Sequence, residues 1–161
     1  MSRYDELRVF YTRSPGERMA LLEQEMRAPL AEAARLAAEL TAMDDSAAPA
    51  LFGGRLGELV EIVGISAAKL AAVAGQALGL SERARAVGGL RDEDLHVFRH
   101  DMLTPIGTLR GVAGMLAQAG GGDDAGLPPD FAARASALVA AIDELKDVLD
   151  ALTDTRGRTR G

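Results

Sequence analysis

QEMRAPL at residues 24–30 recurs as HDMLTPI at residues 100–106, an offset of 76 positions. The methionine and the proline are identical in the two copies, and the acidic residue and the final apolar residue are chemically similar. A second motif, Phe-x-x-Arg-x-x-x-Leu-Val, begins at Phe52 and again at Phe131, an offset of 79 positions. Two motifs that recur in the same order at nearly the same offset predict a duplicated unit.

Turn and capping residues divide the chain into four long helical segments. The run SPGE at residues 14–17 is typical of a helix start, with serine as N-cap, proline in the first turn and glutamate three residues after the cap. The sequence predicts helices over 14–43, 51–78, 92–119 and 128–153. A break at Gly79 and Ser81 is expected to separate the second helix from a short helical piece at 82–87. No segment alternates polar and apolar residues, so strands are not expected.

The fold class predicted from this pattern is all-α. One amphipathic hairpin cannot bury its own apolar stripe, but two can, by forming an antiparallel four-helix bundle with pseudo-two-fold symmetry. Residues 1–13 are then an N-terminal helical extension, 14–80 the first hairpin, 81–155 the second hairpin and 156–161 a disordered tail, with both hairpins in one domain. Because one chain supplies both hairpins, a monomer is favoured, and a homodimer is the alternative.

Composition excludes several classes of function. The chain has 161 residues, a net charge of −6 and no cysteine. The acidic surface disfavours nucleic acid and anionic lipid as partners, and the lack of cysteine excludes disulfides and thiolate chemistry. No apolar run reaches the roughly 20 residues that span a bilayer, and the charged N-terminus lacks a signal-peptide core, so we expect a cytoplasmic protein.

The helix expected over 92–119 has a distinct polar face. At about 100° per residue, its core stripe falls on one side. The stripe consists of Leu95, Phe98, Met102, Ile106, Leu109, Ala113 and Leu116. His100 and Thr104 fall nearly opposite the stripe, with Gly107 and Gly111 below them and His96 one turn above.

Pro105 lies inside this helix and is expected to kink it beside His100, because proline removes a hydrogen bond and clashes with the preceding turn. The cost is about 3 kcal/mol for an interior proline and about 1 kcal/mol for each glycine relative to alanine. A helix selected only for stability would avoid both residue types, so the pattern indicates that a partner approaches closely below His100.

Phe98 and the run HDMLTPI at 100–106 resemble the H-box of the dimerisation and histidine-phosphotransfer domain of sensor histidine kinases. The resemblance implies that His100 is the phosphoacceptor, that Asp101 orients its imidazole and assists proton removal, and that Thr104 places a water that dephosphorylates a partner. A neutral imidazole is a good nucleophile near pH 7, which agrees with this assignment.

Three departures from that family shape the functional prediction. Leu103 stands at a position that is usually basic, whereas the first copy has Arg27. The first copy also has Gln24 and Ala28 in place of histidine and threonine, so it cannot accept phosphate. No nucleotide-binding motif follows the second hairpin, so neither ATP-dependent kinase activity nor a cofactor is expected.

The sequence therefore predicts a histidine phosphotransfer protein of a two-component phosphorelay. His100 would exchange a phosphoryl group with the aspartate of a response-regulator receiver domain, with phosphatase activity toward that receiver as a further expectation and a histidine kinase as a second partner. We expect the docking surface to include His96, Leu103, Gly107, Gly111 and Arg134.

Alternatives remain for the protein and for single residues. The bundle could be a non-catalytic adaptor that binds a receiver or a kinase, or a purely structural dimerisation module. His96 and His100 have the i, i+4 spacing of metal ligands, but no further ligands are evident, so no metal is expected. Arg134 could instead form an ion pair or cap its helix, and Thr104 could bond back to the carbonyl of residue 100.

Overall fold

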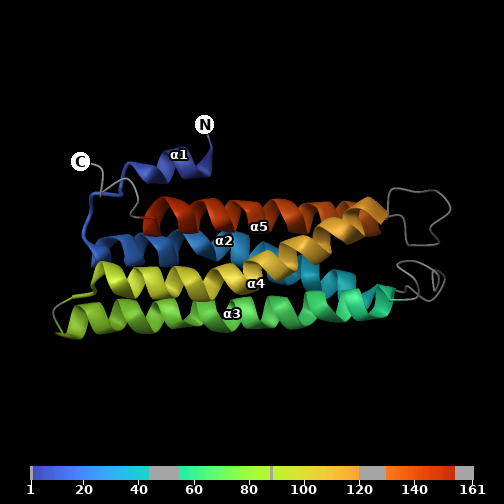
Figure 1. Cartoon of the computed structure of the whole chain (residues 1–161), viewed down its shortest axis with the longest axis horizontal. Coiled ribbons are helices and arrows are strands. Elements are labelled where there is room, and N and C mark those ends of the chain that lie inside the picture. The colour runs from blue at the N-terminus through green and yellow to red at the C-terminus, as the bar shows by residue number, and fades with distance from the viewer. Residues whose placement is uncertain (1, 44–54, 88, 120–129, 155–161) are drawn as a thin grey trace.

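The computed structural model describes residues 2–43, 55–87, 89–119 and 130–154. This part of the chain is entirely helical and contains no strand. The helices are α1 (Arg3–Arg8), α2 (Pro15–Ala42), α3 (Leu56–Val87), α4 (Asp92–Ala119) and α5 (Phe131–Thr153). The four long helices form an antiparallel bundle, and α1 packs on α5 (Figure 1). The predicted all-α bundle is confirmed.

Each long helix has two neighbours in the bundle. Helix α2 packs against α3 and α5, and α4 packs against the same two helices, so α2 and α4 are diagonal. The first hairpin is therefore α2–α3 and the second is α4–α5. No helix in the described ranges combines the length and apolarity needed to cross a membrane.

The two hairpins bury matching positions. We call two residues counterparts when they are related by the offset of 76 in the first helices or 79 in the second helices. In α2 and α4, the buried counterpart pairs include Met19 and Leu95, Leu22 and Phe98, Met26 and Met102, Ala37 and Ala113, and Leu40 and Leu116. Burying each large apolar side chain contributes about 1.5–3 kcal/mol relative to exposing it, so this shared register fixes how both helices face the core.

The expected break in the second helix is wrong. Helix α3 continues through Gly79 and Ser81 to Val87. Glycine costs only about 1 kcal/mol in a helix, and packing of α3 against both α2 and α4 outweighs that penalty. The expected loops at 44–49 and 120–124 and the tail at 156–161 lie outside the described residues.

A buried arginine joins the helices at the end of the bundle where α1 lies. The Arg18 side chain is only 1 % exposed, donates to the carbonyl of Leu152 at 3.1 Å and pairs with Asp92 at the start of α4. Arg8 donates to the carbonyl of Asp154 at 2.7 Å. The last carbonyls of a helix have no partner within it, so these arginines cap α5 and link it to α1, α2 and α4.

Candidate functional site

His100 projects from α4 into solvent, and its side chain is 81 % exposed. The predicted core stripe of this helix is confirmed, because all seven of its residues are buried. Pro105 is buried in the middle of α4, and the ribbon of α4 changes direction near its middle (Figure 1). The helix therefore holds the imidazole on the face opposite the core, where a second molecule can reach it.

Asp101 lies beside one nitrogen of the His100 ring. The distance from His100 Nδ1 to Asp101 Oδ1 is 3.8 Å, which is longer than a hydrogen bond but close enough for electrostatic attraction. A carboxylate on this side favours the tautomer with its proton on Nδ1. The lone pair of Nε2 is then left to act as a nucleophile.

The other polar positions predicted on this face are exposed as well. His96, Thr104, Gly107 and Gly111 are all exposed. The Thr104 carbonyl accepts a hydrogen bond from the Thr108 hydroxyl at 3.2 Å. A Cβ atom added at Gly107 or Gly111 would meet nothing within 4 Å, so packing inside the protein does not require glycine at either position.

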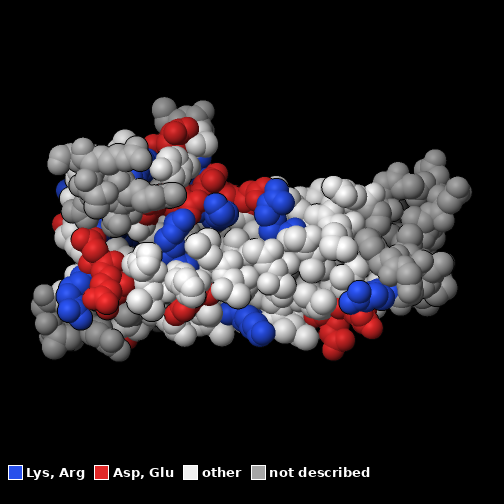
Figure 2. Space-filling model, viewed as in Figure 1, with Lys and Arg blue, Asp and Glu red and all other residues white. Residues whose placement is uncertain are grey.

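Uncharged surface continues along α4 from this face. In the view of Figure 2, most of the surface over α3 and α4 carries neither acidic nor basic side chains. Two large apolar side chains of α4 are exposed, Val97 at 54 % and Met115 at 46 %. Leu103 is half-buried and packs against the core. Exposed apolar surface of this kind is typical of protein interaction sites.

Charged pairs connect α4 to α5 on the flank of this face. Arg99 forms an ion pair with Asp150, and Arg99 Nη1 donates to Thr153 Oγ1 at 3.3 Å. Lys146 Nζ donates to the same Asp150 carboxylate at 2.8 Å. Sequence reasoning missed this cluster. The available signals were the i, i+4 spacing of Lys146 and Asp150 and the position of Arg99 directly before His100.

Two further acidic residues surround this cluster. Asp143 accepts a hydrogen bond from Arg110 Nε at 2.7 Å, and this bond raises the pKa of Arg110. Partial burial raises the pKa of Asp147 above its ordinary value, and the neighbouring charges of Asp150 and Asp143 raise it further. The outer side of α5 is therefore crowded with negative charge.

The structure does not bring Arg134 to His100. Arg134 pairs with Glu39 of α2 and with Asp130, both at 3.3 Å, as the ion-pair alternative predicted. It lies sixteen residues before Asp150 on α5, which corresponds to about 24 Å along the helix. Phosphate contact by Arg134 at His100 therefore has no support in this geometry.

The first hairpin lacks the same chemistry at its counterpart positions. Gln24, the counterpart of His100, is exposed, and Glu25, the counterpart of Asp101, is paired with Arg3 of α1. Within the described residues, no three histidine or acidic side chains are grouped so that they could hold a metal ion. Both histidines of the chain therefore lie on α4, and the ion-pair cluster lies on its flank with α5.

Comparison with protein-family models, with curated proteins and with solved structures finds no match to this chain.

Proposed function

We propose that this protein is a histidine phosphotransfer protein that exchanges a phosphoryl group between His100 and the aspartate of a receiver domain. The observation that carries the proposal is the His100 imidazole, which is 81 % exposed on the face of α4 opposite the core and has the Asp101 carboxylate 3.8 Å from its Nδ1. Such a group can act as a nucleophile toward a phosphoryl donor that reaches it from solvent.

The transfer follows from the two ring nitrogens. The Nε2 lone pair attacks the phosphorus of the aspartyl phosphate in line, so that a P–N bond forms as the P–O bond breaks. The partner's carboxylate leaves with the bonding electron pair. The imidazole then carries positive charge, which Asp101 stabilises beside Nδ1 until that proton is lost. The reverse steps return the phosphoryl group to a receiver, and no redox partner is needed.

The surface around His100 supports docking of a folded partner. The exposed glycines at 107 and 111 leave the backbone of α4 open to close approach, and Val97 and Met115 supply exposed apolar area. The second face of the bundle lacks a nucleophile, because Gln24 stands at the counterpart of His100. Each chain therefore carries one phosphoryl group.

The direct test is transfer from a phosphorylated receiver. The intact chain is incubated with receiver domains from its own genome, each loaded on its aspartate with labelled acetyl phosphate. We expect acid-labile, alkali-stable label on the chain, which is lost in His100→Gln and kept in the matched control His96→Gln. Failure of every receiver to transfer label would contradict the proposal. Binding without transfer would instead identify an adaptor.

Phosphatase activity is a separate part of this proposal and depends on Thr104. Its hydroxyl is exposed one turn after His100 and makes no hydrogen bond within the described residues. It can therefore orient a water at the docked aspartyl phosphate. Thr104→Ala should slow loss of phosphate from the receiver while leaving label on His100, and equal rates of loss in both proteins would contradict this role.

A further inference from the structure

The outer face of α3 carries little charge along the middle of the helix. Residues 62–81 include a single charged residue, Lys69. A helix on the surface of a bundle normally presents charged and polar side chains to water, whereas a helix that is apolar all round is typically covered. On this face Ala68 and Ala72 are exposed, and Ile65 is 49 % exposed. The face therefore has the composition of an interaction surface.

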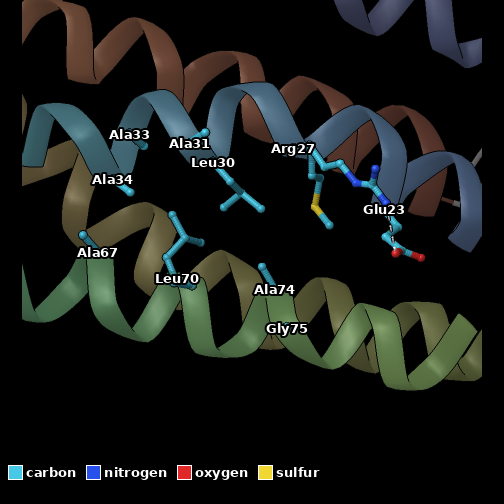
Figure 3. A pocket seen from close by; sticks show the side chains of 12 residues that line it. Glu23, Arg27, Leu30, Ala31, Ala33, Ala34, Ala67, Leu70, Ala74 and Gly75 are labelled. Atoms are coloured by element: carbon cyan, nitrogen blue, oxygen red, sulfur yellow. Dashed lines mark ion pairs between the residues drawn. The ribbon is translucent and has the colours of Figure 1, made fainter. Parts of the chain in front are cut away.

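Apolar surface continues from α3 onto α2. A groove of about 320 Å³ lies between the two helices and is lined mainly by alanines and by Leu30 and Leu70 (Figure 3). Its charged lining residues are Glu23 and Arg27, which lie 3.6 Å apart at one end of the groove. The uncharged area therefore spans two helices and not α3 alone.

Two charges of opposite sign flank Ile65 at equal distances. Glu61 is four residues before it and Lys69 is four residues after it, so the three side chains lie along one side of α3. Both charged residues are exposed, and neither forms an ion pair within the described residues. Eight residues correspond to about 12 Å along a helix, so Glu61 and Lys69 are too far apart to pair with each other. Each can therefore pair with a group on a second molecule.

We infer that a second copy of this chain docks on this face, through antiparallel pairing of the two α3 helices about a two-fold axis at Ile65. Such an axis pairs residue i of one copy with residue j of the other, and j with i. Glu61 then faces Lys69 of the second copy on one side of the axis, and Lys69 faces Glu61 on the other side. The two Ile65 side chains meet between these ion pairs.

The charge pattern of α3 selects this orientation. In an antiparallel pair, residues at equal distances before and after Ile65 face each other, so both contacts join opposite charges. A parallel pair would place Glu61 against Glu61 and Lys69 against Lys69, and both contacts would be repulsive. The face is therefore complementary to itself in the antiparallel arrangement.

Small residues on the same face favour close approach of the two helices. Ala68 and Ala72 project little from α3, and the distance between packed helices, about 8–10 Å, depends on the side chains at the contact. This interface lies outside the four-helix core, so it is compatible with one chain that supplies both hairpins. It does not depend on the proposed role of His100.

Charge reversal of the full-length chain tests the pairing by sedimentation equilibrium. A contact formed mainly by one helix of each copy is small, so the wild type should form a dimer that dissociates on dilution. Glu61→Lys and Lys69→Glu should each raise the dissociation constant at least about tenfold, because like charges then face each other. Glu144→Lys, an exposed acid of α5, is the matched control and should dimerise like the wild type.

Mixing the two charge variants gives the decisive result. A chain with Glu61→Lys carries two positive charges on this face, and a chain with Lys69→Glu carries two negative charges. An equimolar mixture should therefore form heterodimers with a dissociation constant near that of the wild type. A mixture that associates no better than either variant alone would overturn the pairing. A wild type that stays a single chain at every concentration would overturn the inference as a whole.

A single cysteine tests the position of the two-fold axis. The chain contains no cysteine, so a variant carries one thiol per copy. Ile65→Cys places two thiols at the axis, within the distance that a disulfide needs, and mild oxidation should give a covalent dimer. Ala72→Cys, exposed about 10 Å further along the helix, is the control and should remain mostly unlinked. Equal linking of the two variants would overturn the proposed axis.

Discussion

At the scale of single residues, the site depends on two neighbouring side chains of α4 that point in different directions. Both are exposed, the His100 side chain at 81 % and the Asp101 side chain at 48 %. Residues i and i+1 of a helix diverge by about 100°, so their side chains do not stack. The 3.8 Å separation therefore lets Asp101 bias the ring electrostatically without blocking Nε2.

Asp101→Asn removes this bias and should slow phosphoryl transfer to His100 about 100-fold at pH 7, because the positive ring formed during attack loses its carboxylate partner. Transfer rates from a labelled receiver provide the measurement. Glu93→Gln, an exposed acid of the same helix, is the control and should transfer normally. A rate unchanged in Asp101→Asn would show that His100 acts without assistance from Asp101.

Asp147 gives a pH-dependent prediction. Its pKa is raised in the folded state by partial burial and by Asp150 and Asp143, so the folded state binds the proton more tightly than the unfolded state. Stability should therefore fall as pH rises from the ordinary aspartate pKa through the raised value. In thermal unfolding, Asp147→Asn should raise the Tm at pH 7 and leave it unchanged near pH 3. An equal gain at both pH values would contradict the electrostatic cause.

At the scale of the helix, α4 contains two features that lower its helical stability and that its packing alone does not explain. Pro105 removes one hydrogen bond from the helix interior, and the exposed glycines lower helix propensity without filling a tight contact. Pro29 occupies the same position in α2, so the proline belongs to the duplicated unit and not to the surroundings of His100 alone. The glycines at 107 and 111 have no glycine counterparts in α2, where Ala31 and Arg35 stand.

Gly107→Leu tests whether the open backbone of α4 serves docking. The added side chain has free space and a better helix propensity, so the free energy of unfolding should rise by about 1 kcal/mol or less. Transfer from the receiver should nevertheless fall at least about tenfold, because the side chain stands where the partner approaches. Loading from phosphoramidate should not change. Gly57→Leu, at an equally open position on α3, should leave transfer unaffected.

At the scale of the whole molecule, the end of the bundle near α1 is held by polar contacts as well as by the core. Arg18 donates to the carbonyls of Arg13 and Leu152 at 3.1 Å each and pairs with Asp92. Leu7 of α1 is buried against the core, and Arg8 caps α5. A buried arginine is tolerated only when its donors are satisfied, and here acceptors from α4, from α5 and from the segment before α2 satisfy them.

Arg18→Met should lower the free energy of unfolding by about 2–3 kcal/mol, since the carbonyls of Arg13 and Leu152 and the Asp92 carboxylate each lose one donor. For a chain of this length, that corresponds to a fall in Tm of roughly 5–10 °C. Arg35→Met removes an exposed arginine whose partners among the described residues are Glu32 and Glu39 of its own helix, and it should leave the Tm nearly unchanged. A Tm equal to that of the wild type in Arg18→Met would mean that apolar packing alone holds this end.

Local sequence determined the helices, the duplication and the exposed face of α4. These features follow from short-range rules, because apolar spacing at 3.6 residues fixes which side of a helix is buried. The predicted core stripe of α4, on the face opposite His100, and the predicted start of α2 at Pro15 are confirmed for that reason. The same local rules failed at Gly79, where packing against two neighbouring helices overrode a weak breaker.

Only the tertiary structure decided which charges meet. Arg99 and Asp150 are 51 residues apart, Arg18 and Leu152 are 134 apart, and no local pattern relates them. Long-range ion pairs depend on how antiparallel helices are aligned lengthwise. Apolar periodicity does not fix this alignment, because a helix shifted along its neighbour still buries the same stripe. That alignment brings Arg99 to Asp150 and places Arg134 beside Glu39, far from His100.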